Sequence, residues 1–455
     1  MSVKEKTQVT SPTIDAVHTE GYISSDDSPM NRFLRKITFF SSGGAFLDGY
    51  VLSLIGVALT LMTPHLGLTP EWSAAIGASA LAGIFFGAIL GGYFTDIVGR
   101  RIMFIIDVIV IAVLSVAGAF ANDAATVFAS RFLMGVFIGA DYPIATSLIA
   151  EFAPKKHRAV AMGVVSLSWY VGATAAAFVG WGLYVVDNGW QMMLSSAVIP
   201  CFILLVGRHD IPESPRWLRK KGRFAEADAV VERVYGPGVV MDIPDEPAAP
   251  MRLVFQGGYG KRVLFLGVFI LCQVVPMYAI YTFGPDIMGA FGMAAGRDSI
   301  LGEAIVSCFF IAGNIPAMFW LNSMGRRRMT LIGFCGMFIG LAILAIWPTA
   351  PIQIIIAGFG VYAFASGAPG ILQWLYPNEM FPTEVRATAV GLAIAFSRIG
   401  VVISTYGQPL FMAQYGVGAT MAVGAGLVLV ALVWSFFAAP ETRGMSLEES
   451  SAVDD

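Results

Sequence analysis

The chain has 455 residues, of which 56% are hydrophobic and only 13% are charged, with a formal net charge of −3. Soluble globular proteins carry roughly 25% charged residues, so this composition excludes a soluble enzyme, and the charge gives no reason to expect a nucleic-acid partner. The apolar stretches run for about 18 to 25 residues, as transmembrane helices do, and not for the roughly 10 alternating residues of a membrane β-barrel strand. The sequence therefore predicts an all-α polytopic membrane protein.

In chain order, residues 1–37 form a polar tail, residues 38–208 contain six apolar stretches, and residues 261–440 contain six more. The segment between them, residues 209–260, is charged and contains prolines, so it cannot lie in hydrocarbon. We expect this linker, the N-terminal tail and the C-terminal tail of residues 441–455 to be cytoplasmic. The predicted spans are 38–62, 73–95, 102–120, 125–150, 159–184, 190–207, 261–285, 299–321, 329–347, 351–376, 388–409 and 417–438.

Lysine and arginine predict the orientation, because cytoplasmic loops of membrane proteins hold an excess of them. With both termini inside, the basic clusters near residues 100–101, 155–158 and 326–328 are all cytoplasmic. Arg297 is then the one basic residue in an external loop. The sequence predicts a multi-pass protein of the cytoplasmic membrane with both termini in the cytoplasm.

The two halves repeat each other, since three chemically distinct motifs of the first half recur in the second in the same order and nearly the same register. Because an even number of spans separates the copies, the halves have the same orientation. The repeated pairs are Asp96-Ile-Val-Gly99-Arg100-Arg101 with Asn322-Ser-Met-Gly325-Arg326-Arg327, Glu151 and Arg158 with Glu379 and Arg386, and Pro212-Glu-Ser with Pro440-Glu-Thr.

These motifs resemble those of the major facilitator superfamily, specifically its sugar porter branch and neighbouring metabolite/proton symporters. The resemblance implies the major facilitator fold, with twelve transmembrane helices in two parallel six-helix halves around a site at the membrane midplane. It rests on Gly92-Tyr-Phe-Thr-Asp96 to Arg101, Arg131-xxx-Gly135-xxx-Gly139, Glu151-Phe-Ala-Pro154 to Arg158, Pro212-Glu-Ser-Pro-Arg-Trp217, Pro377-Asn-Glu379 to Arg386, and Pro440-Glu-Thr-Arg-Gly444.

Other motifs resemble different branches of the superfamily, so the resemblance leaves the substrate open. Gln273 is followed by Tyr278 where sugar porters usually carry an asparagine, which argues against ordinary hexose binding. Asp48-Gly-Tyr50 resembles aromatic acid/proton symporters, Gly139-Ala-Asp141-Tyr-Pro143 resembles phosphate/proton symporters, and Ser397-Arg398-Ile-Gly400 resembles organic anion carriers.

Ionisable residues inside apolar stretches are costly and usually face an interior cavity. We expect Asp48, Arg131 and Asp141 to couple transport to protons, because burial disfavours a charged carboxylate and lets it exchange a proton as the cavity changes sides. In the resemblance the fourth-span arginine answers a first-span aspartate, for which Asp48 is the candidate. The alternative is a structural ion pair that never titrates. Asp141 is either a second proton site or a substrate ligand.

The predicted substrate site lies in the seventh, tenth and eleventh spans. Arg398 stays protonated, so it either pairs with a fixed acid or binds an anionic group of the substrate. Amide, phenol and indole groups are expected around it; for Tyr281 we expect packing only. The candidate substrate residues are Arg398, Gln273, Tyr278, Gln373 and Trp374.

We expect a cytoplasmic gate of ion pairs within and between the halves, which would hold the outward-facing state shut and break on opening inward. The candidate gate residues are Asp96, Gly99, Arg100, Arg101, Glu151, Arg158, Gly325, Arg326, Arg327, Glu379 and Arg386. Three further acids, Asp107, Asp286 and Glu303, lie near predicted span ends, where we expect them to be solvated.

No GxxxxGK[ST] loop is present to hydrolyse ATP, so the energy for transport must come from a gradient. We expect a secondary transporter that moves a small polar metabolite, an organic acid or a sugar-like molecule, together with a proton by alternating access. The alternatives are a passive sugar or polyol uniporter and a non-transporting nutrient sensor. No enzyme activity, cofactor or metal site is predicted; the expected partners are substrate, proton and lipid bilayer, and a monomer suffices.

Overall fold

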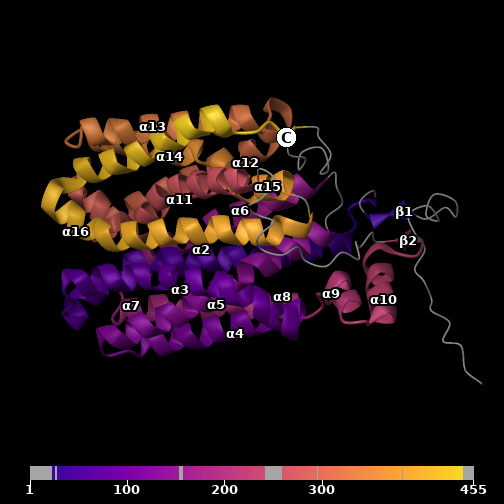
Figure 1. Cartoon of the computed structure of the whole chain (residues 1–455). Coiled ribbons are helices and arrows are strands. Elements are labelled where there is room, and N and C mark those ends of the chain that lie inside the picture. The colour runs from indigo at the N-terminus through magenta and orange to yellow at the C-terminus, as the bar shows by residue number, and fades with distance from the viewer. Residues whose placement is uncertain are drawn as a thin grey trace, which may run out of the picture.

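The computed structural model describes residues 23–25, 28–152, 157–240, 259–294, 296–381 and 383–443. Within them, long helices lie side by side along one common direction and form a bundle (Figure 1). Eleven helical stretches are long and apolar enough to cross a membrane, and the last of them contains two spans. The prediction of an all-α polytopic membrane protein is confirmed.

The N-terminal half of the bundle contains seven helices that make six spans. The sixth span is divided into α7 and α8 at Ala197, because Pro200 has no N–H to donate to the carbonyl of Ser196. The helices are α2 (Arg32–Leu66), α3 (Pro70–Val98), α4 (Arg100–Ala119), α5 (Ala124–Phe152), α6 (Arg158–Leu183), α7 (Gly189–Ser196) and α8 (Val198–Arg208).

The C-terminal half repeats this arrangement. The predicted tenth span is divided at Ser366 into two helices. Helix α16 contains two spans that meet at Gly416, where a positive φ of 83° breaks the helix. The helices are α11 (Tyr259–Ala290), α12 (Arg297–Met324), α13 (Arg326–Ile346), α14 (Ile352–Ala365), α15 (Gly367–Met380) and α16 (Thr383–Ala438).

The linker between the halves contains α9 (Pro215–Lys220) and α10 (Phe224–Tyr235), which lie beyond one end of the bundle (Figure 1). Strand β2 (Val239–Val240) pairs in parallel with β1 (Ile23–Ser24) beside them. The side chain of Asn31 joins this region to the bundle, since it caps α2 at Leu34 N and donates to the carbonyl of Val234 at 2.7 Å. This cap extends α2 six residues before the predicted span.

The bundle has two ends, a basic end and a far end. The basic end carries Arg100, Arg101, Arg326 and Arg327 at the starts of α4 and α13, and the far end is the opposite one. The halves meet where α2, α3 and α6 pack against α11, α12, α15 and α16. Any site shared by both halves must therefore be built from these seven helices.

Candidate functional site

A buried cluster of charged side chains lies inside the N-terminal half, toward the basic end. Asp107 on α4, Asp141 on α5 and Arg208 at the end of α8 are 1%, 3% and 1% exposed. Arg208 lies 3.6 Å from one carboxylate oxygen of each aspartate. Asp107 lies seven residues into α4, about 10 Å along the helix from its basic end. Two acids thus surround one base, which leaves the cluster one negative charge in excess unless it holds a proton.

Backbone contacts fix Arg208 in this position. Its Nη1 donates to the carbonyl of Phe104 at 2.8 Å and its Nε to the carbonyl of Phe40 at 3.3 Å, while the guanidinium stacks 3.4 Å from the Phe104 ring. Gly44 of α2 lies directly against the cluster, because a Cβ there would overlap the Asp141 carboxylate. The cluster therefore joins α2, α4, α5 and α8 at a point where no side chain separates α2 from Asp141.

This cluster corrects two expectations from the sequence. Asp107 was expected to be solvated because it lies near the end of a predicted span, but it is buried beside Arg208 of α8. The partner of Asp141 was not identified, because Arg208 lies one residue beyond the predicted sixth span and was not considered among the charges inside the apolar stretches. Its place at the last turn of an apolar stretch was the signal available in the sequence.

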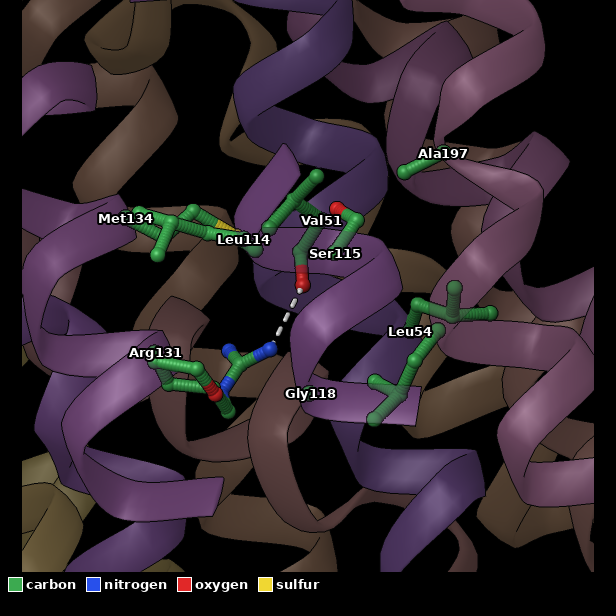
Figure 2. Close-up of a pocket in the computed structure, with 10 residues that line it drawn as sticks. Val51, Leu54, Leu114, Ser115, Gly118, Arg131, Met134 and Ala197 are labelled. Atoms are coloured by element: carbon green, nitrogen blue, oxygen red, sulfur yellow. Dashed lines mark hydrogen bonds between the residues drawn. The ribbon is translucent and has the colours of Figure 1, made fainter. Parts of the chain in front are cut away.

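The structure describes no ion pair between Asp48 and Arg131. Both side chains are buried, but the Nη1 of Arg131 points to the backbone carbonyl of Val51, 3.5 Å away (Figure 2). Its Nε and Nη2 find no hydrogen-bond acceptor among the described residues. Arg131 also lines a cavity of about 10 Å³, roughly the space of one water molecule, together with Ser115 and Ser130. A backbone carbonyl thus takes the place at which a carboxylate was expected.

At the interface of the halves, the structure brings part of the predicted substrate site together. The guanidinium of Arg398 on α16 lies 5.2 Å from the centre of the Tyr278 ring on α11. Gln273 lies five residues before Tyr278 on the same helix and is fully buried, and its Oε1 has no hydrogen-bond donor among the described residues. Buried amide groups without partners are costly, so a polar ligand is a natural partner for Gln273.

The other two predicted substrate residues lie on α15. Gln373 donates to the carbonyl of Gly370 on its own helix at 3.0 Å, and Trp374 is half-buried. Gly370 is also the point at which α15 meets the other half, since its carbonyl accepts from Ser166 of α6 at 3.2 Å. Ser166 in turn accepts from Asn314 of α12 at 2.9 Å. A chain of polar groups therefore crosses from one half to the other beside Gln373.

Several polar residues at this interface were missed by reasoning from the sequence. Trp169 of α6 packs against Tyr278 and Tyr281, with ring centres 5.8 and 5.1 Å away, and its indole N–H has no acceptor among the described residues. Gln408 of α16 is buried with both amide atoms unpaired within the described part of the chain. Amides inside apolar stretches, such as Asn314 and Gln408, were the available signal. As expected, Tyr281 packs among aromatic rings.

At the basic end, the repeated motifs build the same contact twice. Gly99 precedes α4 with a φ of 107°, which L-residues rarely adopt, and the carboxylate of Glu213 accepts from the backbone N–H groups of Arg100 and Arg101 at 2.9 and 3.1 Å. The N-terminus of a helix carries partial positive charge, so each half places a glutamate where it stabilises a helix.

The second copy of this contact is Gly325, with a φ of 93°, and Glu441, which accepts from Arg326 N and Arg327 N at 2.9 and 3.1 Å. Each second arginine donates to the last turn of its own half: Arg101 to the carbonyl of His209 and Arg327 to that of Phe436. Arg101 and Arg327 therefore contact backbone carbonyls of their own half, whereas the sequence suggested acidic partners for them.

Among the predicted gate residues whose side chains are described, Arg326 forms an ion pair with Glu379 of α15, at 2.8 Å. Thr442 also donates to Glu379, so α13, α15 and the C-terminal segment meet there. The side chains of Asp96, Glu151, Arg158 and Arg386 lie outside the described part of the structure. Ion pairs between the halves at this end therefore stay a prediction.

The far end is closed by contacts between the halves. Gly56 of α2 faces the carbonyls of Tyr281 and Thr282 so closely that a Cβ would lie 2.7 Å from the Thr282 oxygen. Arg297 at the start of α12 stacks on Trp181 of α6, with 3.9 Å from its guanidinium carbon to the ring centre. These contacts join α2 and α6 of the first half to α11 and α12 of the second at the far end.

Comparison with known proteins places these features in a family context. A family model described as "Sugar (and other) transporter" matches residues 36–453. The putative metabolite transport protein YaaU of Escherichia coli (strain K12) is 47% identical, over 94% of this chain and 96% of that protein. The arabinose-proton symporter of Bacillus subtilis (strain 168) is 26% identical, over 89% of this chain and 92% of that protein. The xylose transporter XylE from E. coli, solved in a partially occluded inward-open conformation, is 20% identical with a TM-score of 0.78, covering 91% of this chain and 100% of that one.

Proposed function

Because the chain belongs to the sugar (and other) transporter family, we propose that it moves a small polar metabolite across the membrane together with a proton. The predicted relationship to the major facilitator superfamily is confirmed, and the chain is a multi-pass membrane transporter of metabolites, not an enzyme. The proposal concerns the coupling to protons, the residues that carry it and the kind of metabolite.

The observation that carries proton coupling is the excess of buried acid over buried base around Arg208. An unpaired charge inside a low-dielectric interior is so costly that an acid group takes up a proton instead. Asp107 and Asp141 therefore hold one proton between them, with Arg208 balancing the other carboxylate. Asp48 lies one helical turn beyond Gly44, the residue that touches Asp141, so it is the next acid along α2 toward the membrane centre.

In the proposed cycle, Asp48 and Asp141 exchange protons with one side of the membrane at a time, as the halves rock around the interface between α6, α11, α15 and α16. With both termini in the cytoplasm, the basic end faces inward, and a proton moves inward with the substrate. A cluster that holds a proton in the closed form and loses it on hydration couples the gradient to this motion.

For the substrate, Arg398, Tyr278, Gln273, Gln373 and Trp374 supply one fixed cation, amides and aromatic faces. A guanidinium binds a carboxylate through paired hydrogen bonds, so we infer an organic acid as the first class to test. A sugar-like molecule, which uses amide and aromatic contacts without the cation, is the second. The relatedness to the arabinose-proton symporter supports this second class.

The test is uptake into proteoliposomes with an imposed pH gradient, inside alkaline, against a panel of carboxylates, pentoses, polyols and phosphate. Native protein should concentrate at least one of these compounds. Asp48→Asn and Asp141→Asn should exchange labelled substrate across the membrane but no longer concentrate it, whereas Asp123→Asn, at an exposed site, should behave as native. Accumulation by both buried-site variants refutes the assignment, and uptake that ignores the gradient indicates a uniporter.

A further inference from the structure

A second buried carboxyl group lies in the C-terminal half, remote from the cluster around Arg208. Glu303 of α12 is 1% exposed, and within the described residues neither of its carboxylate oxygens has a hydrogen-bond donor or an ion-pair partner. It lies six residues after Arg297, about 9 Å from the far end of α12. A carboxylate in such surroundings is too costly to remain charged, so the closed far end requires Glu303 to be neutral.

Among the residues that the structure describes, the groups around Glu303 offer no compensating positive charge. The charged side chain that acts on it is another acid, Asp286 of α11, and the phenol of Tyr281 faces it from the same helix. Tyr281, Tyr362 of α14 and Tyr170 of α6 each pack against the ring of Phe310. On the described parts of α13 and α15, the ionisable groups are Cys335 and those at the basic end. Repulsion from Asp286 therefore adds to burial in favouring the protonated form.

The segment that covers Glu303 is separated from the rest of α11. Phe283 has non-helical angles (φ −127°, ψ 26°), and Pro285 cannot donate to the carbonyl of Tyr281, so residues 284–290 form a short tip beyond a break. Gly284 of this tip lies directly on the carboxyl group, since a Cβ there would be 2.6 Å from Cδ of Glu303.

The same break contacts the other half. The carbonyls of Tyr281 and Thr282 face Gly56 of α2, and Phe283 packs within 2.9 Å of the Cβ position of Gly77 on α3. Movement of this break away from α2 and α3, which opens the far end, also lifts Gly284 away from Glu303 and exposes the carboxyl group to water. A hydrated glutamate is ionised at neutral pH.

We propose that Glu303 is a proton-binding site that controls closure of the far end. Proton uptake by Glu303 from the far side permits Gly284 to pack over it while Tyr281, Thr282 and Phe283 pack against α2 and α3. Loss of the proton leaves a charge that cannot be buried and holds the tip open. This site goes beyond the proposed coupling through Asp48 and Asp141, because it acts on one gate and needs no substrate.

The experiment measures the distance between spin labels on the two halves as a function of pH, in the full chain without substrate or gradient. The labels are placed at Glu71→Cys on α3 and Ala290→Cys on the tip, both exposed at the far end, with Cys308 and Cys335 replaced by serine. Raising the pH from 5 to 8.5 should lower the ratio of closed to open molecules, by up to about tenfold per pH unit.

Glu303→Gln removes the titrating group without changing its shape, so this variant should stay closed at every pH. Two controls should respond as the native chain does: Asp298→Asn, an exposed acid on the same helix, and His65→Gln, which removes the imidazole that packs against Trp190 at the far end. A distance in the native chain that does not change with pH overturns the proposal, and this measurement does not depend on folding of any Glu303 variant.

A pH response retained by Glu303→Gln, or abolished by His65→Gln, also overturns it. The outcome is independent of the proposed transport reaction. A chain that fails to concentrate any compound can still show the pH-dependent closure, and a working symporter can lack it.

Discussion

Replacement of Arg208 by methionine tests the charge balance of the cluster in the N-terminal half. The change keeps a long side chain but removes the one base that faces Asp107 and Asp141, together with its hydrogen bonds to the carbonyls of Phe40 and Phe104. Breaking a buried ion pair by removing one partner costs about 3–5 kcal/mol, because an uncompensated charge remains. We expect Arg208→Met to lower the free energy of unfolding by this amount.

The double variant Arg208→Met/Asp141→Asn decides whether charge is the reason. Removing one acid as well leaves a single carboxyl group, so part of the loss should be recovered, with a coupling energy of about 1–3 kcal/mol. The assay is unfolding in mixed micelles followed by the fluorescence of the 9 tryptophans. Lys36→Met, which breaks the exposed pair with Asp210, is the control and should change stability far less. If Arg208→Met is as stable as the native chain, or the double variant is less stable than the single one, the reasoning is wrong.

Three further predictions concern both ends of the bundle. Glu213→Gln and Glu441→Gln remove the carboxylates at the starts of α4 and α13. Each should lower the free energy of unfolding by about 1–2 kcal/mol, measured by thermal unfolding. A variant as stable as the native chain would show that these contacts do not stabilise the helices. Gly56→Val should prevent α2 from approaching Thr282, which labelling of cysteines introduced at the interface would detect as access from the far end; unchanged protection would refute the close contact. The hydrogen bond from Lys36, and then the one with His209, lower the pKa of Asp210 in the folded chain. Ionised Asp210 therefore stabilises the fold above the pKa that it has in the unfolded chain, and this stabilisation is lost as the pH falls through the lower pKa of the folded chain. In unfolding curves measured over a series of pH values, Asp210→Asn should lack this loss of stability in acid.

The positions of the spans could be predicted from the sequence, because they depend on residues close together in the chain. Long apolar stretches must be helical in a membrane, since hydrocarbon offers the backbone no other hydrogen-bond partners. A glycine with a positive φ before a helix, as at Gly99, is similarly a local requirement. The breaks at Ala197 and Ser366 lay within predicted spans, although Pro200 and Pro369 mark them.

The pairing of charged groups could not be predicted in this way. Asp48 and Arg131 were matched by analogy, but the neighbours of each are set by helix rotation and packing, and Arg131 meets a backbone carbonyl of Val51 instead. Asp107 and Glu303 were assigned to solvent from their distance to span ends, because position along a helix says nothing about which face is covered. Both are enclosed by other helices, Asp107 beside Arg208 of α8 and Glu303 under Gly284 of α11.

The sequence by itself therefore determined that the chain crosses a membrane as two repeated, parallel halves, since hydrophobic length, basic residues and repeated motifs are properties of neighbouring residues. Only the tertiary structure decided that two acids share Arg208, that Gln273 and Trp169 face the interface with hydrogen bonds unmade, and that the tip of α11 covers Glu303. The physical reason is that burial and charge balance depend on the sum of all neighbours within a few ångströms, and those neighbours are brought together by packing.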